Sequence, residues 1–412
     1  MMPAEISPKI FIYNPTCEMA IANRTVSFMP NKILTKFEQD LDVLPMFFAD
    51  KMDTVLVHQL PDPQFIDMLI NAGVTIPNFK PLSAALADSD FIKMPKGSLH
   101  PWGWSPRIHH IFKPFKKSCS PDFLNQPNAC WKAEHRDLYS RKKALEIGTD
   151  AINRRKNSLF IDPDQTAQVC TSVLEVENLM SKWKQIVIKA PLSSAGRGIQ
   201  ILRYASLNES IIQSINGILA SQSYVMVEPF FNKLFDFSLQ YYCNGKGEAN
   251  YLGLGFFETD SKGQYLSNYL GGIPSKMEKL LTGKYIHELE SCMSETLADS
   301  DIATNYTGYF GVDCMLVLDR EEKLRIHPCL EINLRYNMST LALFLNKNIR
   351  SGSKGNFKIF NQFKASFDQF HLEMIKKHPL EIQDGKWVNG YLPLVSPFQN
   401  KTFGAYILLE KE

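Results

Sequence analysis

Apolar and polar residues follow a strand–helix–strand pattern over the first part of the chain. KIFIYNP (9–15) and DTVLVHQ (53–59) are short apolar runs that end in turn or polar residues, as β-strands do. PDPQFIDMLINAG (61–73) carries apolar residues at helical spacing, with Pro and Asp at its start and Gly at its end, before VTIPNF (74–79) resumes an extended pattern. This order is typical of a parallel sheet, so we expect a small α/β domain here.

From Gln185 onward the pattern changes to apolar strands separated by short turns. Short turns join antiparallel neighbours, because a parallel return needs a crossover of a dozen or more residues. Helical spacing recurs at 136–148 and from Lys284. This half is therefore expected to be α+β, with antiparallel sheets. The strand-like segments are QIVIKAPLSS, GIQILRY, SYVMVEPFF, FDFSLQYYCNG, EANYLGLGFFETD and QYLSNYLGG.

The bulk composition is that of an ordinary globular protein. At 412 residues the chain exceeds one compact core, so two or three domains are expected. Lys and Arg number 45 and Asp and Glu 43, a formal charge of +2, so no overall field attracts nucleic acid or an acidic membrane. The N-terminus lacks the pattern of a secretory signal, and no apolar run approaches the roughly 20 residues of a spanning helix.

The eight cysteines include no C-x-x-C pair and show no metal-ligand spacing. Several, such as Cys314 and Cys329, stand within apolar strands, where a thiol behaves as a small hydrophobe. We therefore expect free thiols, a reducing compartment and a cytoplasmic location.

Residues 95–130 differ from their surroundings, being rich in Pro, aromatic and basic residues. Tryptophans interleaved with Arg107, Lys113 and Lys116 could stack on single-stranded nucleic acid. The alternative is a connecting segment whose aromatic side chains dock between domains. The nearly balanced net charge favours the connecting segment.

The segment GVDCMLVLDREEKLRIHPCLEINLR (311–335) has the pattern of a β-hairpin, with polar DREEK as its turn. If the turn centres near Glu322, Asp313 and Glu331 face each other across the two strands. Two facing carboxylates repel each other and are costly to bury. A divalent cation bound between them offsets both the repulsion and the cost of burial. Mg²⁺ accepts oxygen ligands from Asp, Glu and Asn, with nucleotide phosphates completing its shell. A carboxylate pair bonded to neighbouring Arg or Lys residues explains the pattern equally well.

Two further features concern phosphate and base binding. Lys189 ends an apolar strand, and a loop of small residues that includes Ser194 and Gly196 follows it. Backbone amides of such a loop can cover phosphates beside a lysine charge, although the glycines can also serve only the turn. The strand SYVMVEPFF ends at Glu228, whose carboxylate or carbonyl can accept from an exocyclic amine, or which simply ends a strand before Pro229.

Three features follow one another within residues 136–345: the Lys–Gly loop, the strand-end Glu and the hairpin that ends in E-x-N-x-R. In this order they resemble the ATP-grasp family. The resemblance implies two α+β lobes that clamp ATP, preceded by a small α/β pre-ATP-grasp domain. The implied segments are an N-terminal domain at 1–95, a connecting segment at 96–135, a small lobe at 136–228 with the Gly-rich loop, and a large lobe at 229–412 with the metal-binding hairpin and C-terminal strands.

The resemblance also assigns roles to individual residues. Lys189 would contact phosphates under the loop of Ser194 and Gly196, and Arg335 would stabilise the transferring phosphoryl group. The implied adenine, ribose and early phosphate contacts are Glu228 with Phe230, Asp236, and Arg141 or its neighbour Lys142. The implied metal ligands are Asp313, Glu331 and Asn333. His109, His110, His287 and His327 are interpreted as structural residues.

The implied activity is an ATP- and Mg²⁺-dependent ligase, with Mn²⁺ as an alternative metal. It would join a small-molecule or peptide carboxylate to an amine or thiol through an acyl phosphate. A phosphotransferase acting on a hydroxyl and a non-catalytic nucleotide-binding protein are the alternatives. No membrane or nucleic-acid partner is expected, and a homodimer is one option for the oligomeric state.

Overall fold

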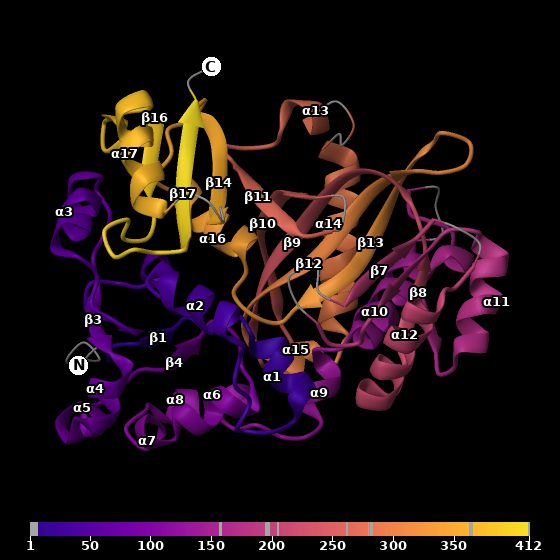
Figure 1. Cartoon of the computed structure of the whole chain (residues 1–412), viewed down its shortest axis with the longest axis horizontal. Coiled ribbons are helices and arrows are strands. Elements are labelled where there is room, and N and C mark those ends of the chain that lie inside the picture. The colour runs from indigo at the N-terminus through magenta and orange to yellow at the C-terminus, as the bar shows by residue number, and fades with distance from the viewer. Residues whose placement is uncertain are drawn as a thin grey trace. The chain divides into compact units, whose positions relative to one another are not determined.

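The computed structural model describes residues 7–155, 159–193, 198–203, 206–260, 263–278, 280, 283–361 and 366–410 (Figure 1). The chain forms two compact units. The first, unit 1, comprises Met1–Trp131, Ser267–Gly272 and Arg335–Glu412, and the second, unit 2, comprises Lys132–Leu266 and Ile273–Leu334. The segment boundaries expected from the sequence stay a prediction.

Unit 1 begins with a four-stranded parallel sheet in the order β3-β2-β1-β4. Helix α3 (Pro63–Asn71) follows β2, starts where the Asp62 side chain accepts from the Gln64 backbone, and ends before Gly73, whose φ of 77° favours glycine. The predicted strand–helix–strand order is therefore present. The strands are β1 (Ile10–Ile12), β2 (Thr54–Val57), β3 (Asn78–Pro81) and β4 (Leu99–Pro101).

Short helices accompany this sheet, several of them from residues 95–130. Trp102, Phe112 and Phe115 are buried in unit 1, so the aromatic residues of this segment contribute to its core. The helices of this part are α1 (Cys17–Asn23), α2 (Lys32–Asp40), η1 (Leu44–Phe48), α4 (Leu82–Ala87), α5 (Ser89–Lys93), α6 (Pro106–Ile111), α7 (Lys113–Lys116), α8 (Pro121–Leu124) and η2 (Pro127–Ala129).

The remainder of unit 1 is an antiparallel arrangement with the strand order β11-β14-β17-β16-β15. Phe357 and Ile407 face each other at its centre and are fully buried. Its elements are β11 (Tyr265–Leu270), α16 (Met338–Asn346), β14 (Lys354–Asn361), α17 (Phe367–Lys377), β15 (Glu381–Gln383), β16 (Lys386–Pro393) and β17 (Phe403–Glu410).

Unit 2 contains a small antiparallel sheet in the order β5-β8-β6-β7. Ile186, Ile188, Val225 and Val227 form its apolar core with Val176 of α11. The strands alternate inward and outward residues, so the polar residues at their ends lie on the other face. The elements are β5 (Gln168–Cys170), α11 (Val173–Trp183), β6 (Ile186–Lys189), β7 (Ile199–Leu202), α12 (Glu209–Gln222) and β8 (Val225–Pro229).

Longer strands of unit 2 pair antiparallel in the order β13-β12-β9-β10. Helix α10 (Arg141–Arg154) packs on β13, and a Cβ at Gly148 would lie 3.1 Å from the Cys329 carbonyl, so glycine permits this close approach. The strands are β9 (Asn232–Asn244), β10 (Ala249–Thr259), β12 (Thr307–Leu318) and β13 (Leu324–Asn333). The other helices are α9 (His135–Leu138), η3 (Pro163–Gln165), α13 (Ser275–Glu278), α14 (Gly283–Ala298) and α15 (Ile302–Asn305).

This architecture confirms the predicted combination of a parallel α/β part with antiparallel α+β parts. All eight cysteines are free, as expected. Within the described ranges, none of the helices combines the length and apolar character needed to cross a membrane.

Candidate functional site

Strands β12 and β13 form the predicted hairpin, and Asp313 faces Glu331 directly. Near the turn Leu318 pairs with Leu324 and Met315 with His327, so the turn is centred one residue before Glu322. A register irregularity between Asp313 and Met315 inserts extra residues into β13. Without this bulge Asp313 would face Cys329, so the bulge is what brings the two carboxylates together.

The two carboxylates have polar neighbours from the same strand pair and from α10. Asn333 donates from Nδ2 to Asp313 Oδ2 at 2.9 Å, and Arg141 donates from Nη2 to Glu331 Oε1 at 2.9 Å. Asp313 and Glu331 are half-buried, whereas Asn333 is buried. The repulsion between the carboxylates is therefore offset on one side by an amide and on the other by a guanidinium.

Arg141 is held in place at the start of α10. The Ser140 side chain accepts from the Lys143 backbone and begins the helix. The Arg141 Nη1 donates to the Ala190 carbonyl at 2.6 Å and to Ser193 Oγ at 2.7 Å, directly after β6. Arg141 thus connects the end of β6 with Glu331, while Lys142 is exposed.

Lys189 and Glu228 come from neighbouring antiparallel strands, and their side chains meet. Lys189 pairs with Met226 in the ladder, so Glu228 lies two positions along on the same face, and Lys189 Nζ is 2.5 Å from Glu228 Oε1. The two side chains are only 11% and 7% exposed. A buried ion pair is a weak source of stability, because both charges lose their hydration.

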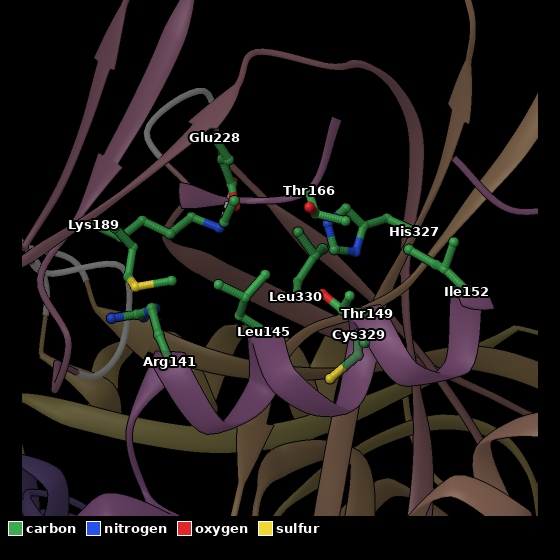
Figure 2. Close-up of a pocket in the computed structure, with 13 residues that line it drawn as sticks. Arg141, Leu145, Thr149, Ile152, Thr166, Lys189, Glu228, His327, Cys329 and Leu330 are labelled. Atoms are coloured by element: carbon green, nitrogen blue, oxygen red, sulfur yellow. Dashed lines mark ion pairs between the residues drawn. The ribbon is translucent and has the colours of Figure 1, made fainter. Parts of the chain in front are cut away.

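This ion pair lines a pocket with an empty volume of about 370 Å³, part of it open to solvent. Figure 2 shows Lys189 and Glu228 reaching toward each other on one side, above the α10 residues Leu145 and Thr149, with His327 on the other side. The pocket is thus built by α10, by the small sheet and by β13. Its walls are Arg141, Leu145, Gly148, Thr149, Ile152, Thr166, Ala167, Lys189, Met226, Glu228, His327, Cys329 and Leu330.

His327 is the residue of this pocket that the sequence interpretation had treated as structural. His327 is 5% exposed, its ring stands edge-on to Phe231, and within the described part of the chain neither ring nitrogen has a hydrogen-bond partner. Burial, with a smaller effect of the Lys189 charge, lowers the pKa of His327 to about 3, so the imidazole is neutral near pH 7. A neutral imidazole offers one donor and one acceptor, and leaving both unsatisfied is costly.

The other predicted site residues have separate partners. The Phe230 backbone N–H donates to the Gln185 carbonyl at 3.0 Å, and its ring lies under the Arg203 guanidinium. The Asp236 carboxylate accepts from Lys233 and Thr259. Arg335 pairs with the buried Glu18 within unit 1. Ser194 and Gly196 lie outside the described residues.

The donor set of the hairpin fits a hard divalent cation. Asp313, Glu331 and Asn333 supply carboxylate and amide oxygens, and Mg²⁺ is commonly held by one or two carboxylates plus substrate phosphates. Among the described residues, no group of three or more His, Cys, Asp or Glu side chains could hold a metal ion. Two carboxylates and one amide are fewer ligands than Mg²⁺ takes, so phosphates or waters would have to complete its shell.

Comparison with solved structures shows the fold. The biotin carboxylase–β-γ-ATP complex from Campylobacter jejuni matches with a TM-score of 0.52 at 10% identity, over 98% of this chain and 88% of that chain. The biotin carboxylase domain of the Hydrogenobacter thermophilus 2-oxoglutarate carboxylase, in complex with MgADP, ADP and bicarbonate, matches with a TM-score of 0.50 at 11% identity, over 98% and 87%.

An N5-carboxyaminoimidazole ribonucleotide synthetase in complex with ADP matches with a TM-score of 0.50 at 10% identity, over 99% of this chain and 93% of that chain. No family model and no curated protein matches the sequence. The structural likeness nevertheless extends over almost the whole chain. The chain therefore has the ATP-grasp fold, with a pre-ATP-grasp domain, as the sequence resemblance implied.

Proposed function

We propose that this protein is an ATP- and Mg²⁺-dependent ligase that joins a carboxylate to an amine or thiol through an acyl phosphate. The observation that carries the proposal is the register of the hairpin, which sets Asp313 against Glu331 and links Asn333 to Asp313. Facing carboxylates on a strand pair repel each other, and here Asn333 and Arg141 each contact only one of them, whereas a divalent cation would join both. The ATP-grasp fold, seen with MgADP in the H. thermophilus domain, supports a nucleotide-bound magnesium as that cation.

The pocket of Lys189, Glu228 and His327 is proposed to receive the nucleotide. The Lys189 ammonium would leave Glu228 for phosphate oxygens, and Glu228 would then accept from the exocyclic amine of adenine. The neutral His327 would satisfy its ring nitrogens on the base. Leu145 and Leu330 provide apolar walls suited to a planar ring.

The bound magnesium would neutralise charge on the transferring phosphoryl group. Arg141, which bonds Glu331 and the end of β6, would position that carboxylate and the strand that carries Lys189. Arg335 lies two residues after Asn333 in the sequence. It stays predicted to stabilise the negative charge on the phosphoryl group during its transfer. The substrate carboxylate would attack the γ-phosphorus and release ADP, and the nucleophile would then displace phosphate from the acyl phosphate.

The deciding experiment incubates the protein with ATP, Mg²⁺ and pooled carboxylates and amines, and follows ADP and phosphate separately. Ligation predicts phosphate release that requires both a carboxylate and a nucleophile. A phosphotransferase would release ADP without free phosphate, and a non-catalytic binding protein would release neither. Glu321→Gln is the matched control for Glu331→Gln, because Glu321 is an exposed acidic residue of the same hairpin.

A further inference from the structure

A second pocket lies in unit 1, at the carboxyl ends of the parallel strands β1 and β2. Its empty volume is about 770 Å³, including the part open to solvent. Tyr13 and Asn14 follow β1, His58 follows β2, and residues in or next to α1, α2, α4 and α6 provide the remaining walls. In open sheets with parallel strands, ligands bind outside the carboxyl ends where the strand order reverses, and in the order β3-β2-β1-β4 this point is at β1.

The Tyr13 hydroxyl is an unsatisfied polar group in this pocket. Tyr13 is 4% exposed, its ring packs edge-on against Trp102, and its hydroxyl has no hydrogen-bond partner among the described residues. Burial, followed by the nearby Glu38 carboxylate, raises the pKa of Tyr13, so the group remains a hydroxyl that can donate. A buried donor without an acceptor is rare in folded proteins and indicates that something else completes the site.

Charged groups of both signs line the same pocket. Arg107 Nη1 lies 3.4 Å from Glu38 Oε2, a long contact between side chains that are 25% and 12% exposed. Glu38 also accepts from Thr16 Oγ1 at 2.5 Å. Asp42 accepts from the His58 backbone N–H, and burial raises the pKa of its carboxyl to about 7, although the nearby Lys401 ammonium opposes this shift.

The lining also contains apolar side chains, beside the polar Thr35, Gln39 and Ser105. Leu56 and Val57 at the end of β2 and Ile108 of α6 are buried, and Leu82 and Ile111 extend the same surface. A ligand that fills the pocket therefore meets both charged and apolar side chains.

We propose that this pocket binds a small α-amino acid with an apolar side chain, its ammonium on Glu38 and its carboxylate on Arg107. The amino nitrogen and carboxyl carbon of an α-amino acid are about 2.5 Å apart, which suits antiparallel alignment with the Glu38–Arg107 pair. The Tyr13 hydroxyl donates to the ligand carboxylate.

Binding itself does not depend on the nucleotide site. Only the role of this amino acid as a ligation substrate, through its carboxylate or its amine, rests on the proposed function. The two claims are tested separately, because amino-acid binding can be measured without ATP, and nucleotide binding can be measured without an amino acid.

The test is calorimetric titration of the full chain, without nucleotide, with glycine, alanine, valine, leucine, isoleucine, methionine and phenylalanine. Isopentylamine and 4-methylpentanoate are the analogues of leucine that keep only the amine or only the carboxylate. At least one amino acid is expected to bind, and an apolar one at least tenfold more tightly than glycine. Each leucine analogue should bind at least tenfold more weakly than leucine, because each loses one charge-assisted contact.

Variants locate the binding in this pocket. Arg107→Gln and Glu38→Gln should each weaken amino-acid binding at least tenfold, with Lys51→Gln and Asp67→Asn as exposed controls in unit 1. Tyr13→Phe should weaken it several-fold, and this change removes only a hydroxyl that has no partner in the fold. It therefore tests the site even if a charge variant fails to fold.

Three results would overturn the assignment. These are the absence of binding by all seven amino acids, equal binding by leucine and its two analogues, and unchanged binding in Tyr13→Phe together with a folded Arg107→Gln. If amino acids fail while ATP binds, the pocket is refuted and the nucleotide proposal stands. If amino acids bind and ATP does not, the nucleotide proposal is refuted and the amino-acid pocket stands.

Discussion

Glu331→Gln tests the proposed reaction most directly, because it removes one charge and almost no volume. In the folded protein Glu331 accepts from Arg141 at 2.9 Å, and the two side chains are 29% and 4% exposed. Glutamine keeps a carbonyl oxygen for Arg141, so a charge-assisted hydrogen bond becomes an ordinary one. We expect a loss of about 1 kcal/mol in the free energy of unfolding, which is small enough for the variant to stay folded.

The expected effect on turnover is far larger. A carboxylate that helps to bind a cation at the transferring phosphoryl group contributes several kcal/mol to the transition state, and about 4 kcal/mol corresponds to about a 10³-fold loss. The measurement is the rate of ADP release at saturating ATP and Mg²⁺, alongside urea unfolding of the same preparations. Glu321→Gln, in the turn of the same hairpin, should change neither quantity.

Turnover of Glu331→Gln within threefold of the unmodified protein would refute the reasoning, because the facing carboxylates would then have no part in the reaction. A loss of stability much greater than that of Glu321→Gln, together with normal turnover, would show that Glu331 serves only its pairing with Arg141. An inactive variant that is also unfolded is resolved by Glu331→Asp, which keeps a carboxylate at this position and should retain part of the activity.

His327→Phe should weaken binding of ATP about tenfold, and raise or preserve the free energy of unfolding, because two unsatisfied buried nitrogens disappear; calorimetry and urea unfolding measure the two effects. Between pH 6.5 and pH 5 the free energy of unfolding should fall by about 2 kcal/mol for His327 alone, since the folded-state pKa is lowered to about 3 and only the unfolded chain takes up the proton. The His327→Phe variant should lack this part of the pH dependence, and an unchanged slope would contradict it. Tyr13→Phe, measured without ligand, should raise the free energy of unfolding by about 1 kcal/mol, whereas a decrease would mean that the hydroxyl has a partner. Chelation of Mg²⁺ by EDTA should abolish ADP release and leave the unfolding curve in place, because the cation is expected to bind with the nucleotide.

Local features of the fold were predictable because they depend on neighbours in the sequence. The helix expected at 61–73 is α3, since Asp62, Pro63 and Gly73 define its ends through local backbone preferences. The hairpin around 322 was predictable for a similar reason, although its turn is centred one residue earlier than expected. The facing of Asp313 and Glu331 was predicted, but the structure reaches it through a bulge that the sequence pattern did not reveal.

The sequence by itself determined the alternation of strands and helices and the hairpin, because periodicity and turn residues act within a few positions. The side chains for phosphate and metal chemistry stay a prediction from the family resemblance. Only the tertiary structure decided which of these side chains meet. Arg141 and Glu331 are 190 residues apart in the chain, and no periodic pattern records such a contact. His327 became a pocket residue in the same way, because the bulge next to Pro328 and the packing of α10 on β13 decide what faces it. Contacts of this kind form only when burial of apolar faces brings distant elements together, and burial is a property of the whole fold.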